Sequence, residues 1–73
     1  MKLKYYVPKR DDKGNVNDAL KSVSYYEIDG WDVFEYFKLG DSKNYENRPD
    51  LARLIEESDL FEKVLKEELV LII

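Results

Sequence analysis

Residues 25–37 of the chain read YYEIDGWDVFEYF. This segment holds six of the ten aromatic residues together with four carboxylates, and it contains no basic residue. Aromatic rings pack into a core or against a partner, whereas carboxylates stay in water or meet cations. The way this segment folds therefore decides whether its rings are internal or accessible to another molecule.

Two local structures are compatible with Asp29-Gly30, the dipeptide at the centre of this segment. As a two-residue hairpin turn it would set Glu27 directly against Asp32, which is a repulsive pair. As the start of a helix over residues 30–39 it would supply an N-cap. The helix would carry an apolar stripe at Val33, Phe34 and Phe37. Gly40 follows where a C-terminal cap is expected. Because the start, stripe and stop signals agree, we favour the helix and keep the hairpin as the alternative.

The residues before this segment predict two antiparallel strands. Residues 2–7 alternate between polar and apolar side chains, as in a half-buried strand. Residues 11–15 have the composition of a turn, with Gly14 free to adopt a positive φ. A second strand is expected over residues 21–28, while residues 16–20 either extend it or form one helical turn.

The residues after the segment predict helices and one further strand. Residues 41–47 are polar and are expected to form a loop, and a helix should begin near Pro49. A second helix is expected after Ser58, because the apolar residues that follow it have helical spacing. Ser58 itself can cap the start of that helix. The last five residues, 69–73, are all apolar and are expected to be buried as a strand.

Together these patterns predict an α+β fold, formed by a single domain over residues 1–73. A small antiparallel sheet would combine the N-terminal strand pair with the C-terminal strand and would pack against two or three short helices. If Asp29-Gly30 is a hairpin turn, the sheet gains a strand and loses a helix.

Composition argues against an enzyme. The chain has no histidine and no cysteine, so it lacks the commonest general base and any thiolate metal site. We therefore predict no catalytic residues, no metal site and no cofactor. No stretch approaches the roughly 20 apolar residues of a membrane span, and the N-terminal residues lack the apolar run of a signal peptide. We expect no membrane contact and a cytoplasmic location.

The function predicted from this pattern is protein binding. Tyr and Trp side chains are frequent anchors at interfaces, and neighbouring carboxylates suit a partner with a basic surface. The chain would act as an adaptor or inhibitor, and it would be a monomer or a homodimer paired through residues 69–73. The predicted binding residues are the anchors Tyr25, Tyr26, Trp31 and Tyr36 and the charged rim Glu27, Asp32 and Glu35.

The charge distribution points to a second class of function. Residues 1–24 carry six bases and three acids, whereas residues 25–73 carry six bases and thirteen acids. The acidic part is compatible with a nucleic-acid mimic that blocks a DNA-binding protein. The basic strand, in which Lys2, Lys4 and Tyr6 would share a face, is compatible with weak nucleic-acid binding. Because the net charge is −4, we rank nucleic-acid binding below protein binding.

Overall fold

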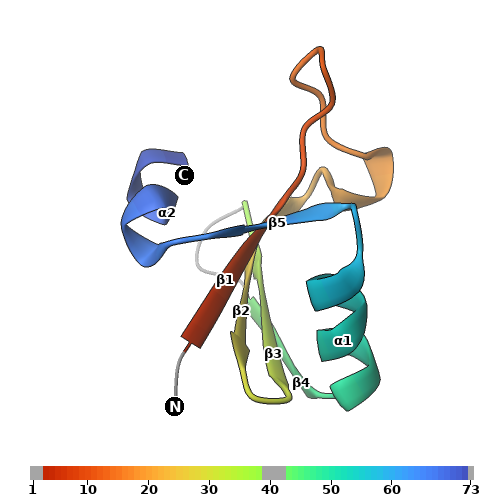
Figure 1. Ribbon diagram of the computed structural model, residues 1–73, viewed down its shortest axis with the longest axis vertical. Coiled ribbons are helices and arrows are strands. Elements are labelled where there is room, and N and C mark those ends of the chain that lie inside the picture. Colours follow the sequence, from red (N-terminus) through yellow and green to blue (C-terminus); the bar gives the residue numbers. More distant parts are fainter. Residues whose placement is uncertain (1–2, 39–42, 73) are drawn as a thin grey trace.

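The computed structural model describes residues 3–38 and 43–72, which form a five-stranded antiparallel sheet and two α-helices. The elements are β1 (Leu3–Pro8), a 3-10 helix (Asp18–Leu20), β2 (Val23–Asp29), β3 (Asp32–Phe37), β4 (Lys43–Asn47), α1 (Pro49–Glu57), β5 (Phe61–Val64) and α2 (Lys66–Ile72). The strand order is β4-β3-β2-β1-β5, so β4 and β5 are the edges. Figure 1 shows α1 and α2 on opposite sides of the strands. This architecture confirms the predicted α+β class, although the sheet dominates it.

The segment after β2 forms a hairpin instead of the predicted helix. β3 pairs with β2 along its whole length, and the turn is Gly30-Trp31 because Asp29 pairs with Asp32. Gly30 has a φ of 63°, whereas the φ of Trp31 is not positive. A positive φ at only the first central position is the pattern of a type II′ turn, whose twist suits paired strands.

The helix prediction over residues 30–39 is wrong. Side chains of residues 32–37 alternate between the two faces of the sheet, and this strand pattern prevails over the apolar stripe expected for a helix. Val33 enters the core, while Tyr36 lies on the other face of the sheet. Aromatic and β-branched residues favour such a strand. The hairpin alternative is correct in type but not in register. Because the turn lies one residue later than Asp29-Gly30, Glu27 faces Phe34 and not Asp32.

The two N-terminal strands are confirmed, with small shifts of their ends. β1 and β2 pair antiparallel, with Tyr5 opposite Glu27. In the connection between them Gly14 has a φ of 80°, and the single helical turn is the 3-10 helix. Of the residues covered by the sequence predictions, those outside the described residues are Met1, Lys2, residues 39–42 and Ile73.

The C-terminal half differs most from the prediction. Residues 43–47 form edge strand β4 and not a loop, whereas α1 begins at Pro49 as expected. A strand near the C-terminus does complete the sheet, as predicted. It is β5, however, which lies where a second helix was expected. Residues 69–72, expected as a strand, belong to α2. A helix forms there because the Leu65 N–H donates to the Glu68 carboxylate at 3.1 Å, which is half of a capping box.

Helix α1 covers one face of the sheet, and α2 covers the β1–β5 side of the other face. The core under α1 contains Tyr6, Val23, Tyr26, Ile28, Val33, Ala52 and Ile55. The smaller core under α2 contains Tyr5, Val7, Val64 and Leu69. We call the face opposite α1, over β2, β3 and β4, the open face. Its side chains, assigned from the strand register, are Tyr25, Glu27, Asp29, Asp32, Phe34, Tyr36, Lys43, Tyr45 and Asn47.

Candidate functional site

A row of aromatic rings crosses the open face. The rings of Tyr25 and Tyr36, which are opposite each other on β2 and β3, are nearly parallel, with their centroids 4.3 Å apart. Tyr5 extends this row from β1, at 6.4 Å from Tyr25. Phe34 and Tyr45 form a second pair, 5.0 Å apart, on β3 and β4. The rings meet in this way because directly opposite residues of paired strands share a face.

A lysine from the edge strand lies over these rings. The Nζ of Lys43 is 5.3 Å from the ring centroid of Phe34 and 5.7 Å from that of Tyr36. Both distances fall within the ~6 Å reach of cation–π attraction. The open face therefore already holds one cation, supplied by its own chain.

Three carboxylates lie at the end of the open face near the hairpin turn. Asp32 accepts hydrogen bonds from the Tyr45 hydroxyl at 2.8 Å and from the Asn47 amide at 2.6 Å. These bonds, led by the one from Asn47, hold the pKa of Asp32 below its ordinary value. Asp29 lies directly opposite Asp32, and its Oδ1 is buried with no hydrogen-bond partner among the described residues. Glu27 is the third carboxylate.

Burial and negative charge raise the pKa of two phenols of this row, Tyr5 and Tyr25. The pKa of Tyr5 is raised by burial first and by the Glu27 carboxylate second. The pKa of Tyr25 is raised by burial, then by the neighbouring Tyr36 and Glu27. Because an ordinary tyrosine already titrates near 10, these groups are neutral at physiological pH. Tyr5 and Tyr25 therefore add no negative charge to that of the three carboxylates.

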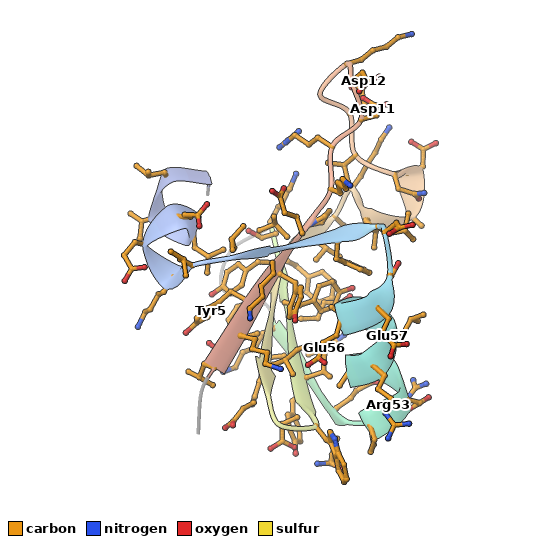
Figure 2. All side chains as sticks on the ribbon, viewed as in Figure 1. Tyr5, Asp11, Asp12, Arg53, Glu56 and Glu57 are labelled. Atoms are coloured by element: carbon orange, nitrogen blue, oxygen red, sulfur yellow. The ribbon has the colours of Figure 1, made fainter. Side chains whose placement is uncertain are left out.

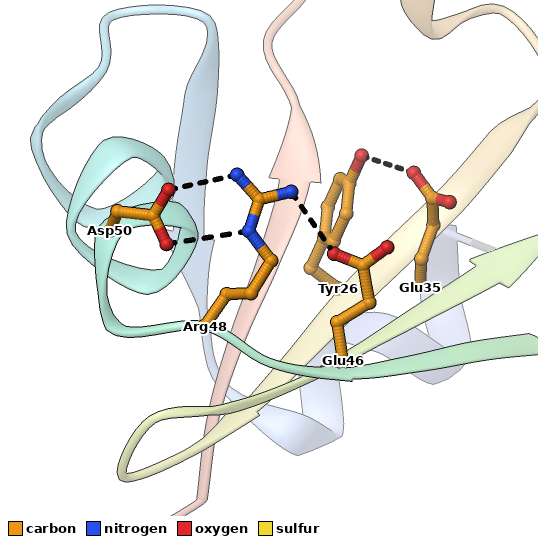
Figure 3. Close-up of polar contacts among 5 residues, drawn as sticks. All are labelled: Tyr26, Glu35, Glu46, Arg48 and Asp50. Atoms are coloured by element: carbon orange, nitrogen blue, oxygen red, sulfur yellow. Dashed lines mark hydrogen bonds and ion pairs between the residues drawn. The ribbon is translucent and has the colours of Figure 1, made fainter.

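Four of the seven predicted binding residues come together on the open face: Tyr25, Glu27, Asp32 and Tyr36. Tyr26 and Glu35 lie on the opposite face, where Tyr26 is only 7% exposed. The Tyr26 hydroxyl donates to the Glu35 carboxylate at 2.5 Å (Figure 3). Burial, followed by this hydrogen bond, raises the pKa of Tyr26. Their assignment to the same surface is wrong, because successive residues of a strand point to opposite faces.

Trp31, the seventh predicted residue, lies at the tip of the β2–β3 hairpin. Its side chain is 59% exposed. The Arg48 N–H donates to the Trp31 carbonyl at 3.2 Å, which ties the tip to the chain leaving β4. The indole is therefore accessible at the same end of the sheet as the Asp29–Asp32 pair.

Sequence reasoning missed what β4 contributes to the open face. Residues 43–47 read KNYEN, with one aromatic and no β-branched residue, so their strand propensity is weak. The sequence signal that could have predicted this strand is alternation. Lys43, Tyr45 and Asn47 occupy every second position, so in a strand they lie on one face. Those three side chains are the ones that contact Phe34, Tyr36 and Asp32 on β3.

Arg48, between β4 and α1, is paired within the chain. Its guanidinium lies 3.3 Å from the Glu46 carboxylate and 2.8 Å from that of Asp50 (Figure 3). All three side chains are exposed, so these ion pairs add little stability. Their effect is to engage two acids that would otherwise be free for a partner.

The basic N-terminal strand does not present rings and cations on one accessible surface. Tyr6 is 6% exposed and packs in the core under α1, and the Lys4 Nζ lies 3.3 Å from the Glu56 carboxylate. Figure 2 shows Glu56 on α1, and it places Asp11 and Asp12 at the tip of the loop after β1. Single strands stack on accessible rings, and the Tyr6 ring is not accessible.

Among residues 3–38 and 43–72, no group of three or more His, Cys, Asp or Glu side chains is placed to hold a metal ion. No helix in this described part of the chain is long and apolar enough to cross a membrane. Comparisons with protein-family models, with curated proteins and with solved structures found no match.

Proposed function

We propose that the chain is a non-enzymatic interaction module whose open face binds a basic segment of another protein. The observation that carries this proposal is the parallel Tyr25–Tyr36 stack on a sheet face that also holds three carboxylates. Tyrosine rings provide a large contact area at a low entropic cost, and the acids provide charge for arginine or lysine.

The position of Lys43 supports a cationic partner. Its ammonium already lies over two rings, so the face attracts positive charge without any change of backbone. A partner arginine could stack on the same rings and reach a nearby carboxylate, because a guanidinium is both planar and charged. Asp32 keeps acceptor capacity for this contact, since a carboxylate has about four lone-pair sites and two are used here.

The proposed mode of action is occupancy of the partner's surface. The net charge of −4 would steer a basic partner toward the chain, and Trp31 at the hairpin tip would extend the contact beyond the tyrosines. The predicted homodimer through residues 69–73 required a strand, and residues 69–72 are helical. We therefore place the binding surface on the open face and not at that segment.

The test is a titration of the isotope-labelled chain, followed by nuclear magnetic resonance, with a short peptide that alternates arginine and leucine. The backbone amides of β2, β3 and β4 should shift in a saturable manner. Glu27→Gln and Trp31→Ala should each weaken binding by at least about 1 kcal/mol, or roughly fivefold, without loss of the fold. Glu57→Gln is the matched control, because it removes the same charge from the exposed surface of α1.

Three outcomes would overturn the proposal. Equal weakening by Glu57→Gln would mean that only the net charge matters. Equal binding of a peptide that alternates glutamate and leucine would remove the preference for basic partners. Binding of a single- or double-stranded oligonucleotide that survives Glu27→Gln would favour a nucleic-acid role instead.

A further inference from the structure

A cavity of about 620 Å³ lies at the end of the sheet opposite the hairpin turn, where β1 ends and β2 begins. Three valines from separate parts of the chain give it an apolar lining: Val7, Val16 and Val23. Val7 and Val23 are buried, at 6% and 4% exposed, so the inner wall of the cavity is the edge of the two cores. Its volume lies within the roughly 300–1,000 Å³ typical of sites for small organic ligands.

Three basic side chains line the same cavity, and they come from two distant segments: Lys9, Arg10 and Lys38. Among the described residues none of the three forms an ion pair. Among the described residues that line the cavity, Glu62 is the single acid, so cations outnumber carboxylates in this part of the lining although the whole chain is acidic. The charge of the cavity lining is therefore opposite in sign to that of the open face, where carboxylates outnumber cations.

The backbone at these bases is held in place by hydrogen bonds. The Lys9 N–H donates to the Leu60 carbonyl at 2.8 Å, and the Lys38 N–H donates to the Ser22 carbonyl at 3.0 Å. The Arg10 guanidinium donates to the Gly14 carbonyl at 2.8 Å through Nη1, which leaves its other N–H groups for a ligand. The guanidinium of Arg10 and the backbone of Lys9 and Lys38 are therefore held in place before any ligand arrives.

We propose that this cavity binds a small amphiphilic anion, meaning a carboxylate or phosphate attached to an apolar group. The valines would contact the apolar group, and the three bases would bind the anionic head with charge-assisted hydrogen bonds. The Ser24 hydroxyl, also in the lining, can donate one further hydrogen bond. This inference does not depend on the open face, because the two sites share no residue.

The experiment titrates the labelled full chain with octanoate and, as neutral and head-only controls, with octan-1-ol and inorganic phosphate. Octanoate should shift the amides of residues around Lys9, Val23 and Lys38 in a saturable manner, and each control should bind at least about tenfold more weakly. A parallel titration with octyl phosphate distinguishes a carboxylate from a phosphate head, since the better head should bind more tightly to the same amides.

Lys9→Gln combined with Lys38→Gln should weaken octanoate binding about tenfold or more. Lys13→Gln combined with Lys66→Gln is the matched control, because it removes the same two charges from exposed lysines outside the cavity lining. If the double variant loses its dispersed spectrum, Lys38→Gln alone should still weaken binding measurably. Equal binding of octanoate and octan-1-ol, shifts at a different place, or an unchanged affinity in the folded lysine variants would each refute the site.

Discussion

Replacing Gly30 with alanine should destabilise the fold by about 1–2 kcal/mol, the cost of holding an L-residue in left-handed backbone. Gly30 has a φ of 63°, and a Cβ placed on it meets no atom within 4 Å. The cost therefore lies in the backbone and not in contacts with neighbours. Because each kcal/mol lowers the Tm of a domain of this size by about 4–8 °C, we expect a loss of about 4–16 °C.

The sign of this change separates the hairpin from a helix over residues 30–39. In a helix, alanine is more favourable than glycine by about 1 kcal/mol, so Gly30→Ala would stabilise the chain. Urea and thermal unfolding, both followed by circular dichroism, measure the sign and the size. The control is D-alanine at position 30, introduced by chemical synthesis, because a D-residue favours a positive φ. A Gly30→Ala chain as stable as the parent, or equal losses for both enantiomers, would refute the turn geometry.

Two further predictions concern ionisable groups. The folded pKa of Asp32 lies below its ordinary 3.8, so its contribution to stability is complete above pH 3.8 and is lost as the pH falls through the folded pKa. Asp32→Asn should therefore flatten the acid limb of a plot of unfolding free energy against pH, and an unchanged limb would contradict the two hydrogen bonds. The raised pKa of Tyr26 means that its contribution is complete below pH 10 and is lost as the pH rises further. Tyr26→Phe should flatten that alkaline limb and cost about 1–2 kcal/mol at neutral pH, because Glu35 loses its hydroxyl donor; a variant as stable as the parent would argue against this bond.

The parts of the fold that could be predicted from the sequence are those with a strong local signal. Alternation marked residues 2–7 and 21–28 as strands, and Pro49 marked the start of α1. The helix predicted from residue 30 onward was wrong, because the helical and the period-two patterns coexist in residues 30–37 and pairing with β2 decides between them. The type II′ turn also moved the register by placing Gly30, and not Asp29, at the first central position.

The C-terminal assignments failed for a different physical reason. Phe61 and Val64 have a spacing that fits a helix, but they lie in β5 because the outer edge of β1 offers backbone partners, with Tyr5 opposite Val64. Once β5 fills that edge, the apolar residues after it bury Leu69 by folding over the sheet. Strand addition at an edge depends on residues some sixty positions apart, and no local pattern encodes it.

The sequence predicted which residue types form the candidate site. It did not predict which of those residues lie on the open face and which lie on the face that α1 covers. Tyr25 and Tyr36 were both singled out, and the register explains why they act together, since they are directly opposite. Tyr26 and Glu35 are also directly opposite, but on the face that α1 covers. Adjacent residues of the chain therefore have different fates. Tyr26 and Glu35 form a hydrogen bond on the α1 side, whereas Tyr25 and Tyr36 stack on the open face.

The Asp29–Asp32 pair of the open face and the bases of the cavity lie at opposite ends of the sheet, and this separation has an electrostatic consequence. The acids Asp29 and Asp32 lie at the hairpin turn, whereas Lys9 and Lys38 lie where β1 and β3 end. The seven residues of β2 span about 20 Å, more than twice the Debye length of ~8 Å at physiological ionic strength. Charges at one end are therefore screened from the other. The two groups of charges should therefore act independently, so Asp32→Asn should leave octanoate affinity unchanged, and the lysine variants should leave peptide affinity unchanged.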